Sequence, residues 1–187
     1  MISPLDLLRR YGNRDYLGEV GVSQVSHMLQ AAELAASDPL MGGNKATILS
    51  ALFHDVGHLL VFERDSNNLM GGYGLKNHEH EGADYLCAFG FPIEVYEPVR
   101  LHVDAKRYLC AKDPSYYDKL SKASQITMGY QGGPMTEEEV EAFEANPVFK
   151  EALALRRWDD AAKVPDDEIV LKTTLDDYEE MLEEMLG

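Results

Sequence analysis

The sequence of 187 residues contains little of what identifies secreted, membrane or zinc-ribbon proteins. Its two cysteines, Cys87 and Cys110, lie far apart without CxxC spacing, so no disulfide framework is expected. Both fall in stretches with a helical apolar pattern, and we expect them to be reduced thiols used for packing. No uninterrupted apolar run approaches the length of a membrane-spanning helix, which excludes a membrane protein at this stage.

Basic residues are also scarce, because 17 Lys and Arg stand against 33 Asp and Glu, for a formal charge of -16. Such a chain repels a polyphosphate backbone, so nucleic acid is not an expected partner. A small anionic ligand would need a local cluster of cations inside this acidic protein. The first ten residues lack the basic start, apolar middle and cleavage site of a secretory signal, so a cytoplasmic location is expected.

Helical periodicity is the main pattern that is present. Apolar residues recur at three- and four-residue spacing, and no comparably long alternating strand pattern appears. Breaks rich in Gly, Pro and Asp separate the periodic segments. The sequence therefore predicts an all-α fold in a single domain over 1–187, with helices at 22–37, 45–57, 78–89, 93–109 and 148–163.

Two further helices are predicted from their terminal signals. Thr136 followed three residues later by Glu139 is a capping box, and Asn146-Pro147 ends that helix. The segment 174–186 pairs apolar with acidic residues in the manner of an amphipathic helix that docks on the core.

The chemistry of the chain centres on its histidines. His54 and Asp55 are adjacent at the end of an apolar helix, so an imidazole and a carboxylate can both reach a buried metal ion. A lone His-Asp pair is a weak signal, and its weight depends on other ligands. His27 and His102 each supply one imidazole from another predicted helix.

A further histidine must come from the segment that begins at Asn77. His78 and His80 are two residues apart and point to nearly opposite sides of a helix, so only one can face the site. His78 shares the apolar face, whereas His80 is predicted to be at the surface. Asp159, in an amphipathic helix near the end of the chain, completes the predicted ligand set.

The order His, His-Asp, His, His, Asp resembles the HD-domain superfamily, with metal-site elements over 16–163. The resemblance implies an all-α HD-domain helical bundle, and His78 and His102 favour two ions over one. Three outcomes stay open: a phosphohydrolase, a di-iron oxygenase, or a non-catalytic regulatory domain. The complete ligand set argues against the last of these. An oxygenase acting on a polyol, like myo-inositol oxygenase, is a further alternative.

The flanking residues resemble a narrower family, the di-iron oxygenases that cleave the C–P bond of 1-hydroxyphosphonates. Tyr16-Leu-Gly-Glu19 is similar to the element whose tyrosine ligates one iron until substrate displaces it. The resemblance implies an Fe(II)/Fe(III) pair bridged by Asp55, with O2 consumed and a carboxylic acid and phosphate formed. It assigns catalytic roles to Tyr16, Glu19 and His58.

The same resemblance implies a phosphonate site. Arg156 lies one turn before Asp159, and its planar guanidinium suits two-point contact with phosphonate oxygens, whereas Arg157 points elsewhere. His58 and Lys106 follow predicted ligands by one helical turn and can face the same cavity. The implied substrate contacts are His58, Lys106, Ser124, Gln131 and Arg156.

The group at the end of the substrate away from the phosphonate remains to be identified. A primary ammonium needs an acceptor such as Glu19, whereas a trimethylammonium group needs aromatic faces. The resemblance favours (R)-1-hydroxy-2-(trimethylammonio)ethylphosphonate, which gives glycine betaine, over 2-amino-1-hydroxyethylphosphonate, which gives glycine. The aromatic candidates are Tyr16, Tyr73, Tyr108, Tyr130 and Phe62.

Overall fold

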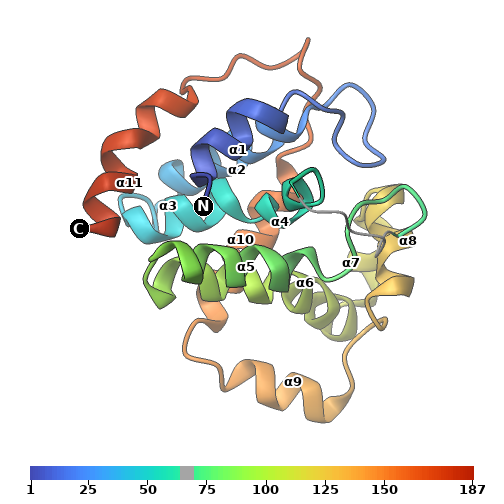
Figure 1. Ribbon diagram of the computed structural model, residues 1–187. Coiled ribbons are helices and arrows are strands. Elements are labelled where there is room, and N and C mark those ends of the chain that lie inside the picture. Colours follow the sequence, from blue (N-terminus) through green and yellow to red (C-terminus); the bar gives the residue numbers. More distant parts are fainter. Residues whose placement is uncertain (64–69) are drawn as a thin grey trace.

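The computed structural model describes residues 1–63 and 70–187. Within them the chain forms helices and one isolated bridge, between Asp15 and Ser23, which confirms the all-α prediction. None of the described helices is long and apolar enough to cross a membrane. The elements in Figure 1 are α1 (Pro4–Tyr11), α2 (Gln24–Ser37), α3 (Lys45–Phe53), α4 (Val56–Leu60), α5 (His78–Phe89), α6 (Ile93–Lys112), α7 (Pro114–Lys119), α8 (Lys122–Tyr130), α9 (Glu137–Glu144), α10 (Phe149–Ala161), η1 (Leu175–Tyr178) and α11 (Glu179–Leu186).

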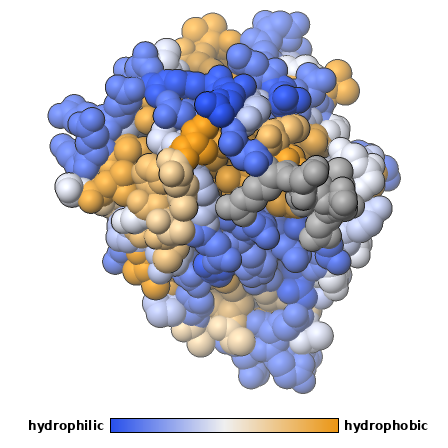
Figure 2. Space-filling view, viewed as in Figure 1, coloured by the Kyte–Doolittle hydropathy of each residue, from blue (hydrophilic) through white to orange (hydrophobic). Residues whose placement is uncertain are grey.

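The core lies where five helices meet. Helix α6 packs against α5, α3 and α10, and α2 packs against α3 and α10 (Figure 1). Met28, Phe53 and Leu155 come from three of these helices and are each almost fully buried. Burial of such apolar stripes contributes most of the stability of short helices. The face shown in Figure 2 is mostly hydrophilic, with smaller hydrophobic patches.

The helix predicted over 45–57 is broken in the structure. Helix α3 ends at Phe53 and α4 begins at Val56, with Asp55 at φ -104° and ψ 11° between them. After the break, α4 approaches α5 closely. A Cβ atom on Gly57 would lie 2.0 Å from the carbonyl oxygen of His78, so only glycine fits there. The break turns His54 and Asp55 toward the interior.

Several other boundaries differ from the prediction. Helices α1, α7 and α8 were not expected, although hydroxyl caps start two of them: Ser3 accepts from the Asp6 amide and Ser121 from the Ser124 amide. Helix α6 extends to Lys112. The capping box of Thr136 and Glu139 is confirmed.

The C-terminal helix and the cysteines complete the comparison with the predictions. The segment after Thr174 forms η1 and α11, which contact α1 and α3, as expected of a docking helix. Cys110 is buried, but Cys87 is exposed, so its predicted packing role is wrong. Cys87 lies on α5, whose buried face carries Gly82, Ala83 and Leu86 instead.

Candidate metal centre

Four buried imidazoles converge on one region of the core. His27 comes from α2, His54 from the turn after α3, His78 from the start of α5 and His102 from α6. The Nε2 atoms of His27 and His54 are 3.0 Å apart, and those of His78 and His102 are 3.1 Å apart. We call these the first histidine pair and the second histidine pair.

The other ring nitrogens show why these pairs fit a cation. Nδ1 of His27 lies 2.7 Å from the carbonyl oxygen of Ala162, and Nδ1 of His54 lies 2.8 Å from that of Ala51. A carbonyl only accepts, so each Nδ1 carries a hydrogen and donates it. In the neutral rings, the two Nε2 lone pairs of the first histidine pair then face each other. Such lone pairs repel unless a positive charge lies between them.

Asp55 lies between the two pairs and faces both. Its Oδ2 is 3.6 Å from Nε2 of His27 and 3.5 Å from Nε2 of His54. Its Oδ1 is 3.2 Å from Nε2 of His78 and 3.6 Å from Nε2 of His102. Burial alone would raise the pKa of Asp55, but the imidazoles, His54 first, hold it well below its usual range. One ionised carboxylate is therefore positioned to bridge two cations.

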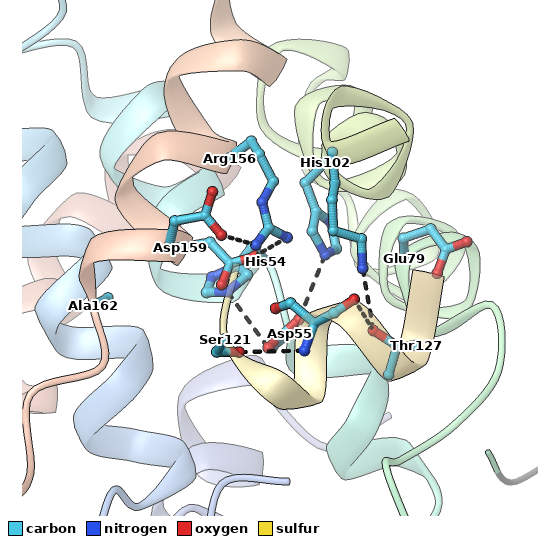
Figure 3. A network of polar contacts seen from close by, with 12 residues as sticks. His54, Asp55, Glu79, His102, Ser121, Thr127, Arg156, Asp159 and Ala162 are labelled. Carbon is cyan, nitrogen blue, oxygen red and sulfur yellow. Dashed lines mark hydrogen bonds and ion pairs between the residues drawn. The ribbon is translucent and has the colours of Figure 1, made fainter. Parts of the chain in front are cut away.

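Asp159 adds a second carboxylate beside the first histidine pair. Its Oδ1 lies 3.5 Å from Nε2 of His27, is buried, and has no hydrogen-bond partner among the described residues. Figure 3 shows Asp159 and Arg156 on α10 reaching toward His54 and Asp55, with His102 alongside. Nitrogen and oxygen donors without thiolate are a set that suits iron, manganese or zinc. The residues thus fit a two-metal site.

Tyr16 covers the centre from the loop between α1 and α2. Its hydroxyl donates to Oδ2 of Asp55 over 2.9 Å, and its ring stacks on His27 with centroids 3.9 Å apart. Burial, and then the charge of Asp55, raise the pKa of the phenol well above its usual value. The predicted neighbourhood of Tyr16 and the metal ligands is therefore present in the structure.

His58 lies beside the second histidine pair and stacks on His78 with ring centroids 3.8 Å apart. Its donor atom falls within 4.8 Å of those of Asp55 and His78, so it could also be a ligand. However, its Nδ1 accepts the Leu75 amide hydrogen over 3.1 Å, which leaves the ring proton on Nε2. Burial, and then the charge of His78, hold its pKa well below 6.5, so the ring is neutral. This geometry favours a hydrogen-bond donor over a metal ligand.

A small cavity opens beside the centre, and cations line it. Lys106 is buried and its Nζ lies 3.2 Å from Oγ1 of Thr127. Burial, and then the charge of Arg156, lower the pKa of Lys106 to about 7. Arg156 is also buried and its Nη1 pairs with Oδ2 of Asp159 at 2.7 Å. The local cations required for an anionic ligand are thus present.

The remaining predicted contacts divide into two groups. Ser124 and Gln131 line the cavity, as do Tyr16 and Tyr73. The other three members of the predicted aromatic set do not line it: Tyr108 packs on Phe143 and Phe149, and Phe62 and Tyr130 are exposed. Tyr108 lies six residues after His102 and so points to another face of α6. His80 and Arg157 are exposed, as expected.

Sequence reasoning missed several residues that the structure places at the site. Lys163 and Thr127 line the cavity, and the buried carboxylate of Glu79 lies 3.4 Å from Nδ1 of His78. For Lys163 a signal was available, because it follows Asp159 by four residues and such residues share a helical face. For Glu79 there was none, since acidic residues at a helix start are common.

Comparison with known proteins gives a consistent result. The sequence model of the HD-domain family matches residues 25–159. The chain is 43% identical over 162 residues to hydroxymethylphosphonate dioxygenase of Gimesia maris, covering 87% of this chain and 77% of that protein. It is 42% identical over 161 residues to the glycine-betaine-forming 1-hydroxy-2-(trimethylamino)ethylphosphonate dioxygenase of Leisingera caerulea, covering 84% and 76%. An uncharacterized protein of Acanthamoeba polyphaga mimivirus is 40% identical over 160 residues, covering 86% and 71%.

Proposed function

This chain belongs to the HD-domain family, and from that premise we propose that it uses two iron ions and O2 to cleave the C–P bond of a 1-hydroxyphosphonate. The observation that carries the proposal is the position of Asp55, with one carboxylate oxygen toward each histidine pair, next to a cavity lined by buried cations. The names of two relatives, both phosphonate dioxygenases, support the same reaction.

The metal-binding residues divide between two positions. His27, His54 and Asp159 would hold one iron, His78 and His102 the other, and Asp55 both, with Tyr16 as a further ligand until substrate binds. An Fe(II)/Fe(III) pair in this site would supply the redox chemistry with O2. The reaction balances without an external reductant: C1 becomes a carboxylate, phosphorus leaves as phosphate, and one O2 is consumed for each substrate.

The protein side chains have three tasks in this reaction. Lys106, Arg156 and the Ser124 hydroxyl would bind the phosphonate dianion, because charge-assisted hydrogen bonds to buried cations are strong. Gln131 would add an amide contact. His58, with its proton on Nε2, would donate a hydrogen bond to a phosphonate oxygen. Tyr16 would leave Asp55 when the substrate hydroxyl arrives, so that the site opens only to a ligand that can take its place.

Both ammonium-bearing substrates belong to this class of 1-hydroxyphosphonates. The trimethylammonium substrate is supported by the name of the Leisingera caerulea relative. Only Tyr16 and Tyr73 of the five aromatic candidates line the cavity, which is a small aromatic surface for a quaternary cation. Hydroxymethylphosphonate, the substrate named for the Gimesia maris relative, has no far end at all.

The decisive experiment measures O2 consumption and phosphate release together. The iron-reconstituted protein is given hydroxymethylphosphonate and the two ammonium-bearing hydroxyphosphonates, in air and under strict anaerobiosis. We expect equal amounts of O2 consumed and phosphate formed, and no phosphate without O2. Phosphate release under anaerobiosis would instead establish a hydrolase. A protein that binds no metal after careful reconstitution would be a non-catalytic HD domain.

A polyol oxygenase is the remaining alternative, since it would share the metal ligands. Arg156→Ala separates the two reactions, because Arg156 is proposed to bind phosphonate and lies outside the ligand set. Loss of phosphonate turnover with full iron content supports the phosphonate reaction. Turnover of myo-inositol by the unmodified protein, without any turnover of hydroxyphosphonates, contradicts it.

A further inference from the structure

Lys163 occupies a position between the centre and the loop that covers it. It lies two residues beyond α10, and its side chain is 12% exposed. Its Nζ is 3.3 Å from Oγ of Ser124, 3.7 Å from Oδ1 of Asp159 and 4.0 Å from Oε1 of Glu19. A single cation thus faces a proposed phosphonate contact, a proposed metal ligand and the carboxylate beside Tyr16.

The carboxylate of Glu19 is held close to this cation by its backbone. The Glu19 amide donates to the carbonyl oxygen of Tyr16 over 3.0 Å, which closes a tight turn. Gly18 in that turn has φ +83°, and a Cβ there would lie 2.9 Å from both Ala123 and Tyr73. Oε1 of Glu19 is buried and accepts no hydrogen bond within the described part of the chain. The positively charged partner of Glu19 among the described residues is therefore Lys163.

This ion pair bears on the far end of the substrate. Among the described residues, Glu19 is the cavity carboxylate outside the proposed ligand set, so it is the natural acceptor for a substrate ammonium. An ammonium that approached Glu19 would have to share it with Lys163 and would be repelled by the like charge. Specificity commonly depends on such a repulsive element as well as on attraction.

We infer that Lys163 selects against substrates with a positive charge at the end away from the phosphonate. The preferred substrates are then 1-hydroxyphosphonates that are uncharged at that end, and hydroxymethylphosphonate is the smallest of them. This inference rests on the proposed function and narrows its substrate class. Because Lys163 also lies 3.7 Å from Oδ1 of Asp159, the test compares the affinities of two substrates in the same variant and does not rely on one affinity alone. The inference opposes the sequence-based preference for the trimethylammonium substrate.

Anaerobic calorimetry on the iron-loaded protein measures this directly, because substrate binds without turnover. The dissociation constants of hydroxymethylphosphonate and 2-amino-1-hydroxyethylphosphonate are compared in the unmodified protein and in Lys163→Met, which keeps chain length but removes the charge. We expect the unmodified protein to favour hydroxymethylphosphonate. Lys163→Met should reduce that preference by about tenfold, equivalent to about 1.4 kcal/mol.

Two further variants control this measurement. Lys163→Arg retains the charge and should retain the preference, whereas Glu19→Gln removes the negative charge that attracts an ammonium and should increase it. Lys112→Met, at an exposed lysine paired with Glu144, should leave both dissociation constants unchanged.

Failure of the inference can be told apart from failure of the proposed function. An unmodified protein that binds the ammonium compound as tightly as hydroxymethylphosphonate overturns the inference, even if Lys163→Met does not fold. An unchanged preference in folded Lys163→Met overturns it too, and in both cases the phosphonate reaction stands. If neither hydroxyphosphonate binds, the proposed function fails and the inference fails with it.

Discussion

The two histidine pairs face the same carboxylate but are held in different ways. In the first pair, main-chain carbonyls of Ala162 and Ala51 accept from both Nδ1 atoms. In the second, His102 donates to the carbonyl of Val99 over 2.7 Å, whereas Nδ1 of His78 faces a side chain. That side chain is Glu79, whose buried Oε2 lies 3.4 Å away.

This difference has a chemical consequence. Neither Nδ1 of His78 nor Oε2 of Glu79 has a hydrogen-bond partner within the described residues, so each is the nearest candidate for the other. A carboxylate behind an imidazole raises its basicity more than a neutral carbonyl does. The second position should therefore bind its metal through one unusually strong imidazole. We therefore expect the metal affinity of the second position to depend on the Glu79 side chain. The imidazoles of the first position have main-chain carbonyls in that place.

The substitution with the largest expected effect removes the carboxylate that the two histidine pairs share. Asp55→Asn takes away the charge that both pairs share, so that two bound cations would repel each other without an anionic carboxylate between them. We expect turnover to be lost and fewer than two irons per chain, measured by elemental analysis and oxygen consumption. The exposed Asp118→Asn is the matched control and should retain both. Two tightly bound irons in Asp55→Asn would show that Asp55 is not shared.

Glu79→Gln tests this difference between the two histidine pairs, because it removes the carboxylate behind His78. Loss of the carboxylate should weaken iron binding at the second position by about 10- to 100-fold, the usual effect of removing such a partner, and leave the first position unchanged. Stepwise iron titration, followed by electron paramagnetic resonance of the mixed-valent form, distinguishes the two positions. Glu81→Gln on the exposed side of α5 serves as control. If iron binding weakened equally at both positions, Glu79 would not distinguish the second histidine pair from the first.

Lys106, one turn beyond His102 of the second pair, gives a dependence on pH. Its pKa of about 7 lies below the usual 10.5, so the free protein loses this cation as pH rises through 7. Binding of a phosphonate dianion should then weaken by about tenfold for each pH unit above 7, a limit set by loss of one required proton. The measurement is the KM between pH 7 and 9. Lys106→Arg should flatten the profile, and a steep profile in that variant would assign the proton elsewhere.

The smallest expected effect concerns the packing that positions the second pair. In Gly57→Ala the added methyl would meet the His78 carbonyl oxygen at 2.0 Å, so α4 and α5 must separate. We expect a loss of about 1–3 kcal/mol in unfolding free energy, typical of overpacking. Gly129→Ala is the matched control, since nothing lies within 4 Å of a Cβ there, and it should be neutral or stabilising. Equal stability of the two variants would exclude a packing role for Gly57.

Sequence reasoning was successful where a property is local. Apolar periodicity identified the five core helices, and the choice of His78 over His80 followed from helical geometry alone. It failed where the answer depends on a neighbouring element. The spacing from His102 shows that Tyr108 points to another face of α6, but nothing in the nearby sequence shows that this face meets Phe143. The close contact of Gly57 with the His78 carbonyl likewise involves two elements, so no single-segment pattern contains it.

Three of the four imidazoles are oriented by main-chain carbonyls, and this has a consequence for how the protein can change. The groups that orient these imidazoles therefore belong to the backbone and not to the side chains of Ala51, Val99 or Ala162. The orientation of three ligands is therefore separate from the cavity wall, where Lys163 and Tyr73 lie. A designer could replace that wall to obtain new substrate ranges while the metal chemistry is inherited unchanged.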